Sequence, residues 1–317
     1  MPLMDLQNRV AIVTGAGRGM GRSHAIMLAS RGARVIVNDI RPAGAAENAA
    51  DEVVRDIVGR GGSAIADEHS VVGGASELVR HAIDAYGRLD IVVNNAGVLS
   101  GTAFADAAPQ DWQSVFDVHF RGTVDVTRAA WPHLVRSGNS RIITTASSGM
   151  LGNVGLSSYG AAKGAIFSLT RSIAMEGKPF GIHANCIFPS AWTRMTMEIN
   201  DPAVSATLQR YFQPEHVSAL VVWLCHQDIK ISNEAFQVSG GRAGRVTMAM
   251  MPTVRVADST PEQWAQHQAE LLADGPLTAL VSTAQMFANE LADADPAIRQ
   301  AMKSSGGGLD INPVTGQ

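Results

Sequence analysis

The sequence predicts an α/β fold in which a doubly wound parallel sheet forms a single domain with a C-terminal extension. Short runs rich in Val and Ile alternate with longer amphipathic stretches, and this alternation is unbroken from Val10 to Gly241. Strands that alternate with helices imply right-handed crossovers and a parallel sheet. Such a sheet is buried on both faces, which explains strands that are apolar throughout.

The elements follow from this alternation in chain order. Short apolar runs, most of them bounded by Gly, Asn or Asp, are the candidate strands Val10–Val13, Val35–Asn38, Ser63–Ala66, Ile91–Val93, Arg141–Thr145, His183–Ile187 and Ala235–Val238. The stretches between them predict helices at Arg22–Ser30, Ala45–Arg60, Ser76–Tyr86, Asp111–Ser137 and Ser158–Glu176. No repeat or linker interrupts the pattern, so we expect one domain over residues 1–247.

The pattern changes after Gly241. Met248, Met250 and Met251 cluster there, and Thr260–Leu272 has the pattern of an amphipathic helix. Methionine adapts to irregular apolar pockets, although core packing or a subunit interface is its more frequent role. We expect residues 248–303 to form an extension packed on the domain, and residues 304–317 to form a flexible tail.

Composition narrows the classes of function. Hydrophobic residues make up 46% and charged residues 17%, as in a packed globular protein. The net charge of −4 and the lack of a basic block argue against a nucleic-acid partner. Cys186 and Cys225 form no paired motif, which favours a reducing cytoplasm. No signal-peptide pattern and no apolar run of ~20 residues is present, so we expect a cytoplasmic protein outside the membrane.

A glycine-rich loop joins the first candidate strand to the first helix. Residues 14–21 read Thr-Gly-Ala-Gly-Arg-Gly-Met-Gly. Gly15 permits a sharp turn, Gly19 lets the backbone approach a pyrophosphate, and Gly21 lets helix and strand pack closely. The anion then lies at the helix N-terminus, where N–H groups favour negative charge. The strand–loop–helix context favours a dinucleotide site at Gly15, Arg18, Gly19, Met20 and Gly21 over a turn without a ligand.

Asp39 ends the second candidate strand, 24 residues after Gly15. A carboxylate there accepts hydrogen bonds from the ribose hydroxyls and repels a 2′-phosphate, which favours NAD over NADP. Arg18 and Arg41 favour the opposite choice, because either could pair with a 2′-phosphate. We give Asp39 more weight because it occupies the contact position itself; its alternative role is to begin a turn before Pro42.

Polar residues also follow the third and fourth candidate strands. Either Asp67 or Ser70 is expected to reach the adenine, and capping of a helix or turn is an equally good role for both. After the fourth strand, Asn95, Ala96 and Gly97 are small or carry an amide. We expect them to hold the underside of the cofactor, although the same residues would also suit a plain turn.

Tyr159 and Lys163 open the helix that follows the fifth strand. Their i, i+4 spacing places both side chains on one helix face. A free Tyr is a poor base at neutral pH because its pKa is near ~10. A neighbouring ammonium and a positive nicotinamide ring both stabilise phenolate, so we expect this pair to move a proton while hydride goes to the cofactor.

In this order, the glycine loop, the turn at Asn94–Gly97 and the Tyr159/Lys163 pair resemble the short-chain dehydrogenase/reductase family, over about Leu6 to Gly241. The resemblance implies a single Rossmann-type domain that transfers hydride between a nicotinamide cofactor and a secondary alcohol or ketone. It also implies Ser–Tyr–Lys chemistry. Homodimers or homotetramers, built through helices that include the Tyr/Lys helix, are the implied assemblies.

The family's catalytic Ser is displaced in this chain. It usually lies 13 residues before the Tyr, a position occupied here by Ala146. Counting along the fifth strand gives Ser147 instead, and we prefer this count because a strand fixes where its end projects, whereas a loop absorbs a deletion. Ser147 is therefore the catalytic candidate and Ser148 its reserve, with turn or cap serines as the alternative.

His119 stands where most of the family carries an Asn that kinks a helix and holds a water linked to the active-site Lys. A His there either keeps a hydrogen-bonding role or is simply buried with a satisfied partner. The remaining histidines lack metal-ligand spacing, so we predict no metal.

Several segments resemble one branch of the family, the (3R)-hydroxyacyl-CoA dehydrogenase portion of peroxisomal multifunctional enzymes and its bacterial stand-alone relatives. They are Val37–Asp39, Val118–Thr123, Thr127–Trp131 and Trp223–His226. The branch implies a small-molecule substrate, a hydroxyacyl-CoA ester or a hydroxysteroid. In the loop after the sixth strand, Thr193 is the candidate for a nicotinamide-side contact, with an ordinary loop as the alternative.

Two other functions compete with an NAD-dependent dehydrogenase. Arg18 suggests an NADPH-dependent carbonyl reductase. The displaced Ser suggests a dinucleotide-binding regulatory protein with impaired catalysis, although retention of Tyr159 and Lys163 argues against that reading.

Overall fold

The computed structural model describes residues 4–99, 101–193, 201–294 and 297. The chain divides into two compact units, Met1–Val246 and Thr247–Gln317. Residues Arg194–Thr196, which adjoin the predicted contact Thr193, lie outside the described part.

The first unit is built on an eight-stranded sheet with the order β3-β2-β1-β4-β5-β6-β7-β8. Its strands are β1 (Val10–Thr14), β2 (Arg34–Asn38), β3 (Ser63–Asp67), β4 (Ile91–Asn94), β5 (Ser140–Thr145), β6 (Ile182–Ser190), β7 (Ala235–Ser239) and β8 (Arg242–Arg245). Strands β1 to β7 pair in parallel, whereas β8 runs antiparallel to β7. The predicted doubly wound parallel sheet is thus confirmed, and the order reverses between β1 and β4, where such sheets bind ligands.

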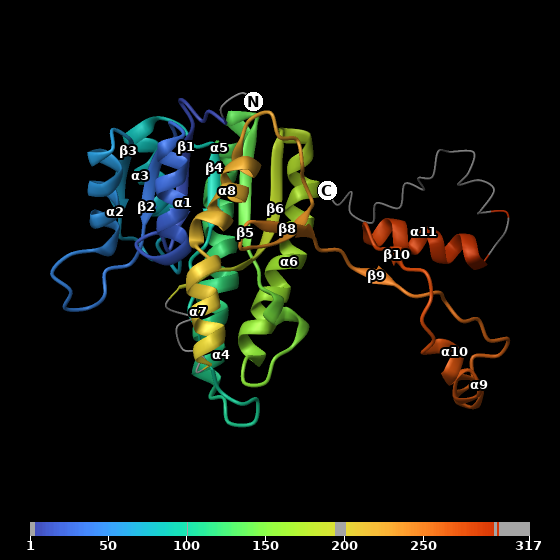
Figure 1. The fold of residues 1–317 in the computed structure, drawn as a ribbon. Coiled ribbons are helices and arrows are strands. Elements are labelled where there is room, and N and C mark those ends of the chain that lie inside the picture. The colour runs from blue at the N-terminus through green and yellow to red at the C-terminus, as the bar shows by residue number, and fades with distance from the viewer. Residues whose placement is uncertain (1–3, 100, 194–200, 295–296, 298–317) are drawn as a thin grey trace. The chain divides into compact units, whose positions relative to one another are not determined.

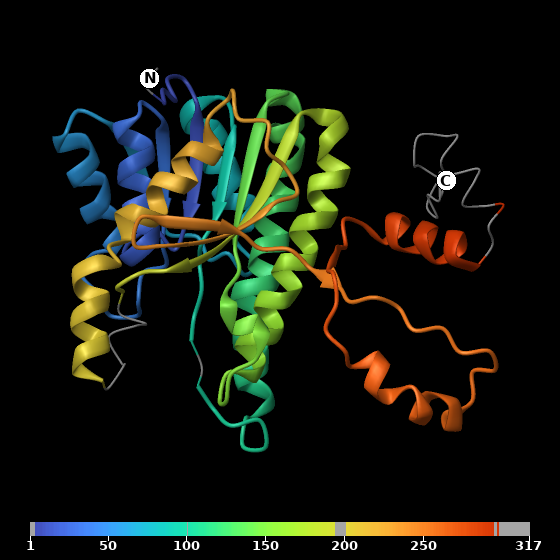
Figure 2. The same ribbon diagram turned by 45° about the vertical axis from the view of Figure 1, so that its right-hand side comes forward.

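Helices cover both faces of this sheet, as Figure 1 and Figure 2 show. They are α1 (Gly19–Ser30), α2 (Ala49–Gly59), α3 (Ala75–Tyr86), α4 (Pro109–Phe116), α5 (Gly122–Ser137), α6 (Ser157–Gly177), α7 (Pro202–Tyr211) and α8 (Pro214–Cys225). A π-helical segment, η1 (Asp117–Arg121), joins α4 to α5, and short 3₁₀ segments are η2 (Ser148–Leu151) and η3 (Lys178–Phe180).

The core lies in layers above and below the sheet. Ala11 and Val13 of β1 pack in the cluster that contains apolar residues of α1, α2 and α8. Val10 and Ile12 point to the other face and pack with residues of α3, α5 and α6. Because successive side chains of a strand alternate between faces, an apolar run such as Val10–Val13 is buried on both sides.

The second unit contains short elements. They are β9 (Ala249–Met250), β10 (Thr278–Ala279), α9 (Pro261–Gln266), α10 (Gln268–Leu271) and α11 (Thr283–Ala294), with β9 and β10 antiparallel. The predicted helix Thr260–Leu272 is divided in two at His267, and Thr260 caps its first half by accepting a hydrogen bond from Gln263 N.

Candidate active site

The glycine-rich loop is fastened to the turn after β4. The Thr14 hydroxyl accepts hydrogen bonds from the Asn95 and Ala96 amides, both at 3.0 Å. In return, the Asn95 side-chain amide donates to the carbonyl oxygens of Thr14 (2.9 Å) and Gly15 (3.1 Å). Asn95 and Ala96, predicted as cofactor contacts, therefore hold the loop in its conformation.

Two glycines of this loop are required by geometry. A methyl group on Gly21 would collide with the Gly15 carbonyl oxygen and come within 2.9 Å of the Ala16 Cα. Gly19 has a left-handed φ of +54°, and the nearest atom to a methyl group there would be Thr193 Cγ2, at 3.5 Å. The outer side of the Gly19 backbone is thus open to a ligand beside the predicted residue Thr193. The N–H groups of Gly19, Met20 and Gly21 begin α1 and have no partner within the helix, so the loop fits a pyrophosphate.

Asp39 lies at the same edge of the sheet. Its carboxylate accepts a 2.8 Å hydrogen bond from the Gly17 amide. Burial raises the pKa of Asp39, although hydrogen bonds from Gly17 and Ile40 and the charge of Arg18 oppose the increase. Arg41, the other candidate partner for a 2′-phosphate, forms a salt bridge of 2.8 Å with Glu68.

The two candidates for the adenine contact are already engaged. Ser70 accepts a hydrogen bond from the Val72 amide (3.1 Å), which is a capping contact. The Asp67 carboxylate accepts hydrogen bonds from Asn38 (2.8 Å), from His69 and from His81. The sequence argument missed both histidines; His69 had a usable signal, since it is a polar residue two positions after Asp67, whereas His81 comes from α3 and had none.

Ser147, Tyr159 and Lys163 come together where β5 meets α6. Ser147 follows β5 and caps η2 by accepting from the Gly149 amide at 3.1 Å, and its side chain is hydrogen-bonded to that of Tyr159. The Lys163 ammonium lies 5.6 Å from the centroid of the Tyr159 ring and donates to the Thr145 carbonyl at 2.6 Å. The serine that is hydrogen-bonded to Tyr159 is therefore Ser147, the residue that the count along the fifth strand favoured.

The pKa of Tyr159 is shifted in the direction opposite to the one expected from its Lys neighbour. Burial raises the pKa of Tyr159, and the hydrogen bond with Ser147 only partly opposes this. Burial lowers the pKa of Lys163 to about 8. Tyr159 is consequently a protonated phenol at neutral pH in this structure, ready to donate a proton.

His119 lies in η1 and packs edge-on against the Tyr159 ring, with ring centroids 5.3 Å apart. Its Nε2 contacts both polar backbone atoms of Val98, the carbonyl oxygen at 2.6 Å and the amide nitrogen at 3.1 Å. Burial, together with the charge of Lys163, lowers the pKa of His119 to about 3. The side chain is thus neutral, and a methyl group on Gly97 would collide with its ring.

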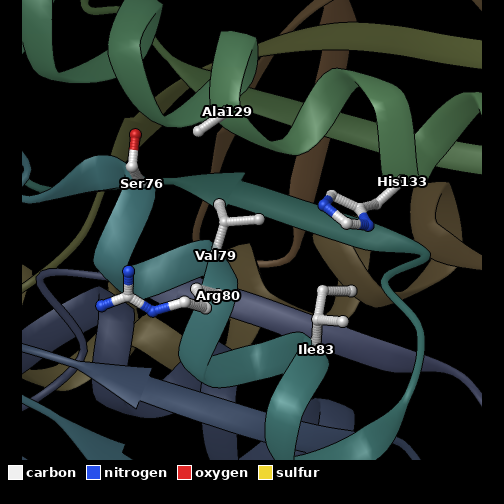
Figure 3. A pocket seen from close by; sticks show the side chains of 6 residues that line it. All are labelled: Ser76, Val79, Arg80, Ile83, Ala129 and His133. Atoms are coloured by element: carbon white, nitrogen blue, oxygen red, sulfur yellow. The ribbon is translucent and has the colours of Figure 1, made fainter.

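A cavity of about 210 Å³ lies between α3 and α5 (Figure 3). Ser76, Val79, Arg80 and Ile83 face it from α3, and Ala129 and His133 face it from α5. No residue predicted to bind or react lines this cavity, so its presence does not bear on the candidate site.

In the described part of the chain, no group of three His, Cys, Asp or Glu side chains could hold a metal ion. Within the same part, no helix is long and apolar enough to cross a membrane.

Comparison with known proteins identifies the family of this arrangement. The family model described as short chain dehydrogenase matches residues 9–203, a segment that runs from the start of β1 to α7. The chain belongs to the short-chain dehydrogenase family. It is therefore an oxidoreductase of the class that acts on CH–OH groups, as the resemblance implied.

Individual relatives place it more closely within this family. The chain is 41% identical to peroxisomal multifunctional enzyme type 2 of Mus musculus over 268 residues, which cover 82% of this chain and 36% of that protein. The crystal structure of a short chain dehydrogenase from Mycobacterium avium matches with a TM-score of 0.76 and 35% identity, covering 87% of this chain and 97% of that one. A 7α-hydroxysteroid dehydrogenase complexed with NADH and a 7-oxo bile acid matches with a TM-score of 0.69 and 28% identity, covering 75% and 96%.

Proposed function

We propose that this short-chain dehydrogenase uses NAD to interconvert a secondary alcohol and a ketone, with a 3-hydroxyacyl-CoA as the first substrate class and a hydroxysteroid as the second. The observation that carries the proposal is the gathering of three side chains: Ser147 is hydrogen-bonded to Tyr159, and the Lys163 ammonium lies 5.6 Å from the centroid of the Tyr159 ring. This group stands at the edge of the sheet that also carries the glycine-rich loop.

Each side chain of the group has a distinct role in the proposal. Ser147 hydrogen-bonds the substrate oxygen and holds the Tyr159 phenol. Tyr159 gives a proton to the oxygen of a ketone, or takes one from an alcohol in the reverse direction. The Lys163 charge stabilises the phenolate that forms when the proton leaves. A bound nicotinamide supplies the carbon that accepts or donates the hydride.

The loop and Asp39 would hold the dinucleotide. Gly15, Gly19 and Gly21 would accommodate its pyrophosphate, and the amides of the first turn of α1 would bind it. Asp39 stands at the end of β2, where a carboxylate favours a ribose 2′-hydroxyl over a 2′-phosphate. Arg18, whose charge acts on Asp39, supports the competing choice of NADP.

Exposed apolar side chains support an apolar substrate. Phe104 is 73% exposed in the loop after β4, and Leu151 and Val154 are 81% and 96% exposed in the loop after β5. Both loops leave the carboxyl edge of the sheet, where Ser147 lies. Exposed apolar side chains on segments that leave this edge are suited to bind another apolar group, such as an acyl chain or a steroid nucleus. The sequence segments resembling (3R)-hydroxyacyl-CoA dehydrogenases favour the former.

The test is the formation of NADH or NADPH by the purified protein. NAD or NADP is offered with (3R)- and (3S)-hydroxyacyl-CoA esters and with hydroxysteroids. NAD-linked oxidation of one enantiomer is the expected result; a preference for NADP would favour the carbonyl reductase. Tight NAD binding without turnover of any alcohol would instead favour the regulatory alternative.

Replacement of Tyr159 by Phe tests the assigned proton donor. We expect Tyr159→Phe to lose at least about 10²-fold in kcat, because the hydroxyl that moves the proton is gone. Its Kd for NAD should stay within a few-fold of the parent. Tyr86→Phe, which removes a hydroxyl on α3 that contacts Ser63, is the matched control and should keep full activity. An active Tyr159→Phe enzyme would remove Tyr159 from the mechanism.

A further inference from the structure

Asp67, at the end of β3, is surrounded by hydrogen-bond donors. Its Oδ2 lies 2.9 Å from His69 Nδ1 and 2.8 Å from His81 Nδ1. Its Oδ1 accepts from the Asn38 side chain at 2.8 Å and from the His69 amide at 3.0 Å. The Asp67 side chain is only 1% exposed, and with four hydrogen bonds it has no lone pair directed at a ligand.

This arrangement fixes the protons of both imidazole rings. Burial alone would raise the pKa of Asp67, but hydrogen bonds from His69, His81 and Asn38 lower it below its ordinary value. An ionised carboxylate can only accept, so the Nδ1 atom of each ring must carry the hydrogen. In a neutral imidazole the Nε2 atom is then a bare acceptor. Both rings are thus held as acceptors by one carboxylate.

The Nε2 edges of the rings face open space. Their side chains are 42% and 39% exposed, and both line a cavity of about 270 Å³. Because Nδ1 of each ring points at buried Asp67, the exposed edge is the opposite one. The charged neighbours in this cavity are Asp51 of α2 and the Arg41–Glu68 salt bridge.

The cavity continues from the position predicted to bind ribose. The Asp39 amide donates to the Asp67 carbonyl, at 3.0 Å, and Asn48, which lines the cavity, donates to the Asp39 carbonyl at 2.8 Å. A nucleotide whose ribose lies at Asp39 can therefore direct its base toward the two rings. There the base meets the Nε2 acceptors of His69 and His81. It does not contact Asp67 directly, because the Asp67 side chain is buried.

We propose that His69 and His81 select the base of the dinucleotide, by accepting hydrogen bonds from the 6-amino group of a 6-aminopurine, and that Asp67 positions them. The inference rests on the proposed function of the site. A 6-oxopurine presents an oxygen acceptor to the same Nε2 atoms, so it is rejected.

The experiment compares the Kd of NAD with that of nicotinamide hypoxanthine dinucleotide, measured by calorimetry on the full chain. We expect the protein to bind NAD at least about tenfold more tightly at about pH 8, which is ~1.4 kcal/mol. In His69→Leu/His81→Leu the ratio should fall to near one.

His133→Leu, which removes an imidazole from the cavity between α3 and α5, is the matched control and should keep the tenfold ratio. A ratio near one in the parent protein, or a tenfold ratio that the double variant keeps, overturns the inference while leaving NAD binding intact. Failure of the parent to bind either dinucleotide overturns the proposed function as well. The single variants His69→Leu and His81→Leu, in which the ratio should fall part of the way toward one, decide the matter even if the double variant does not fold.

Discussion

At the scale of single residues, Lys163 is the most demanding group in the site. The residue is 3% exposed, and its ammonium donates a hydrogen bond to the Thr145 carbonyl at 2.6 Å. Burial of a cation without a carboxylate partner favours the neutral amine, which is why its pKa falls from 10.5 to about 8. Lys163 thus makes a specific contribution to the pH dependence of stability.

The sign of this contribution can be stated. Between pH 8 and 10.5 the unfolded chain holds a proton on Lys163 that the folded chain has released, so the free energy of unfolding rises with pH. The rise is about 3 kcal/mol at most. We expect urea denaturation from about pH 7 to 10 to show it in the parent and not in Lys163→Met. Parallel curves for the two proteins would contradict the lowered pKa.

Gly21 is a second residue whose role can be measured. Gly21→Ala places a methyl group against the Gly15 carbonyl and should destabilise the fold by about 1–3 kcal/mol while weakening NAD binding. Gly59→Ala, at the last residue of α2 with no atom near the added methyl, is the control and should be neutral or slightly stabilising. Thermal unfolding and NAD titration of both variants provide the comparison, and equal effects would contradict the steric argument.

Ser147 shows how a strand count selects a candidate site residue, whose catalytic role stays a prediction. The strand count selected it because β5 fixes where the chain leaves the sheet, and the structure pairs Ser147 with Tyr159. His69 and His81 could not be selected in this way. His81 lies on α3 and reaches Asp67 only because the helix packs beside the end of β3. A contact that depends on packing between two elements has no fixed spacing along the chain.

At the scale of elements, the helix predicted over Asp111–Ser137 consists of three consecutive helical segments. The π-helical segment η1 lies between α4 and α5 and contains His119. Such a bulge adds a residue to one turn, and π-bulges frequently occur at functional sites. Here it places the His119 ring against both Gly97 and Tyr159. Periodicity alone cannot distinguish this bulge from continuous α-helix.

The contact between η1 and the turn after β4 predicts a thermodynamic coupling. Gly97→Ala should destabilise the protein by about 1–3 kcal/mol because its methyl group would collide with the His119 ring. In a His119→Ala background the same change should cost less, leaving a coupling energy of at least ~0.5 kcal/mol. A double-mutant cycle by urea denaturation measures this. Additive effects would mean that the ring and Gly97 do not constrain each other.

The strands were easier to predict than the ends of the helices. Val35–Asn38 and Ile91–Val93 are apolar on both faces, which few elements other than a buried parallel strand allow. Helix α2 begins at Ala49 and not at the predicted Ala45, because Asn48 caps it by accepting from the Ala50 amide. Strand β8 was missed because its residues are exposed and polar, although the Gly240-Gly241 turn before it was a usable signal.

At the scale of the whole molecule, the two units differ in their interior. The first contains three clusters of buried apolar side chains. In the second, Ala288 is the one buried hydrophobic residue among those described, whereas Leu272 and Leu277 are 74% and 65% exposed. The proposed packing of residues 248–303 on the domain stays a prediction. The second unit has little core of its own to resist local opening.

Limited proteolysis should reveal this difference. Brief trypsin treatment is expected to cleave first after Arg255, an exposed residue of the second unit, and to leave an N-terminal fragment that unfolds cooperatively. Mass spectrometry identifies the cut, and thermal denaturation of the fragment tests its cooperativity. Arg242 and Arg245 should be cut later because they lie in β8, paired with β7. Early cleavage within β8 would contradict this order.

The four hydrogen bonds among Thr14, Gly15, Asn95 and Ala96 have a kinetic consequence. They hold the glycine loop in one shape before any ligand arrives, so we expect little chain entropy to be lost when a dinucleotide binds. Association should then be a single step, with an observed rate that increases linearly with dinucleotide concentration and does not level off at an isomerisation rate. Because the loop is already rigid after folding, diffusional encounter alone should set the rate of dinucleotide binding.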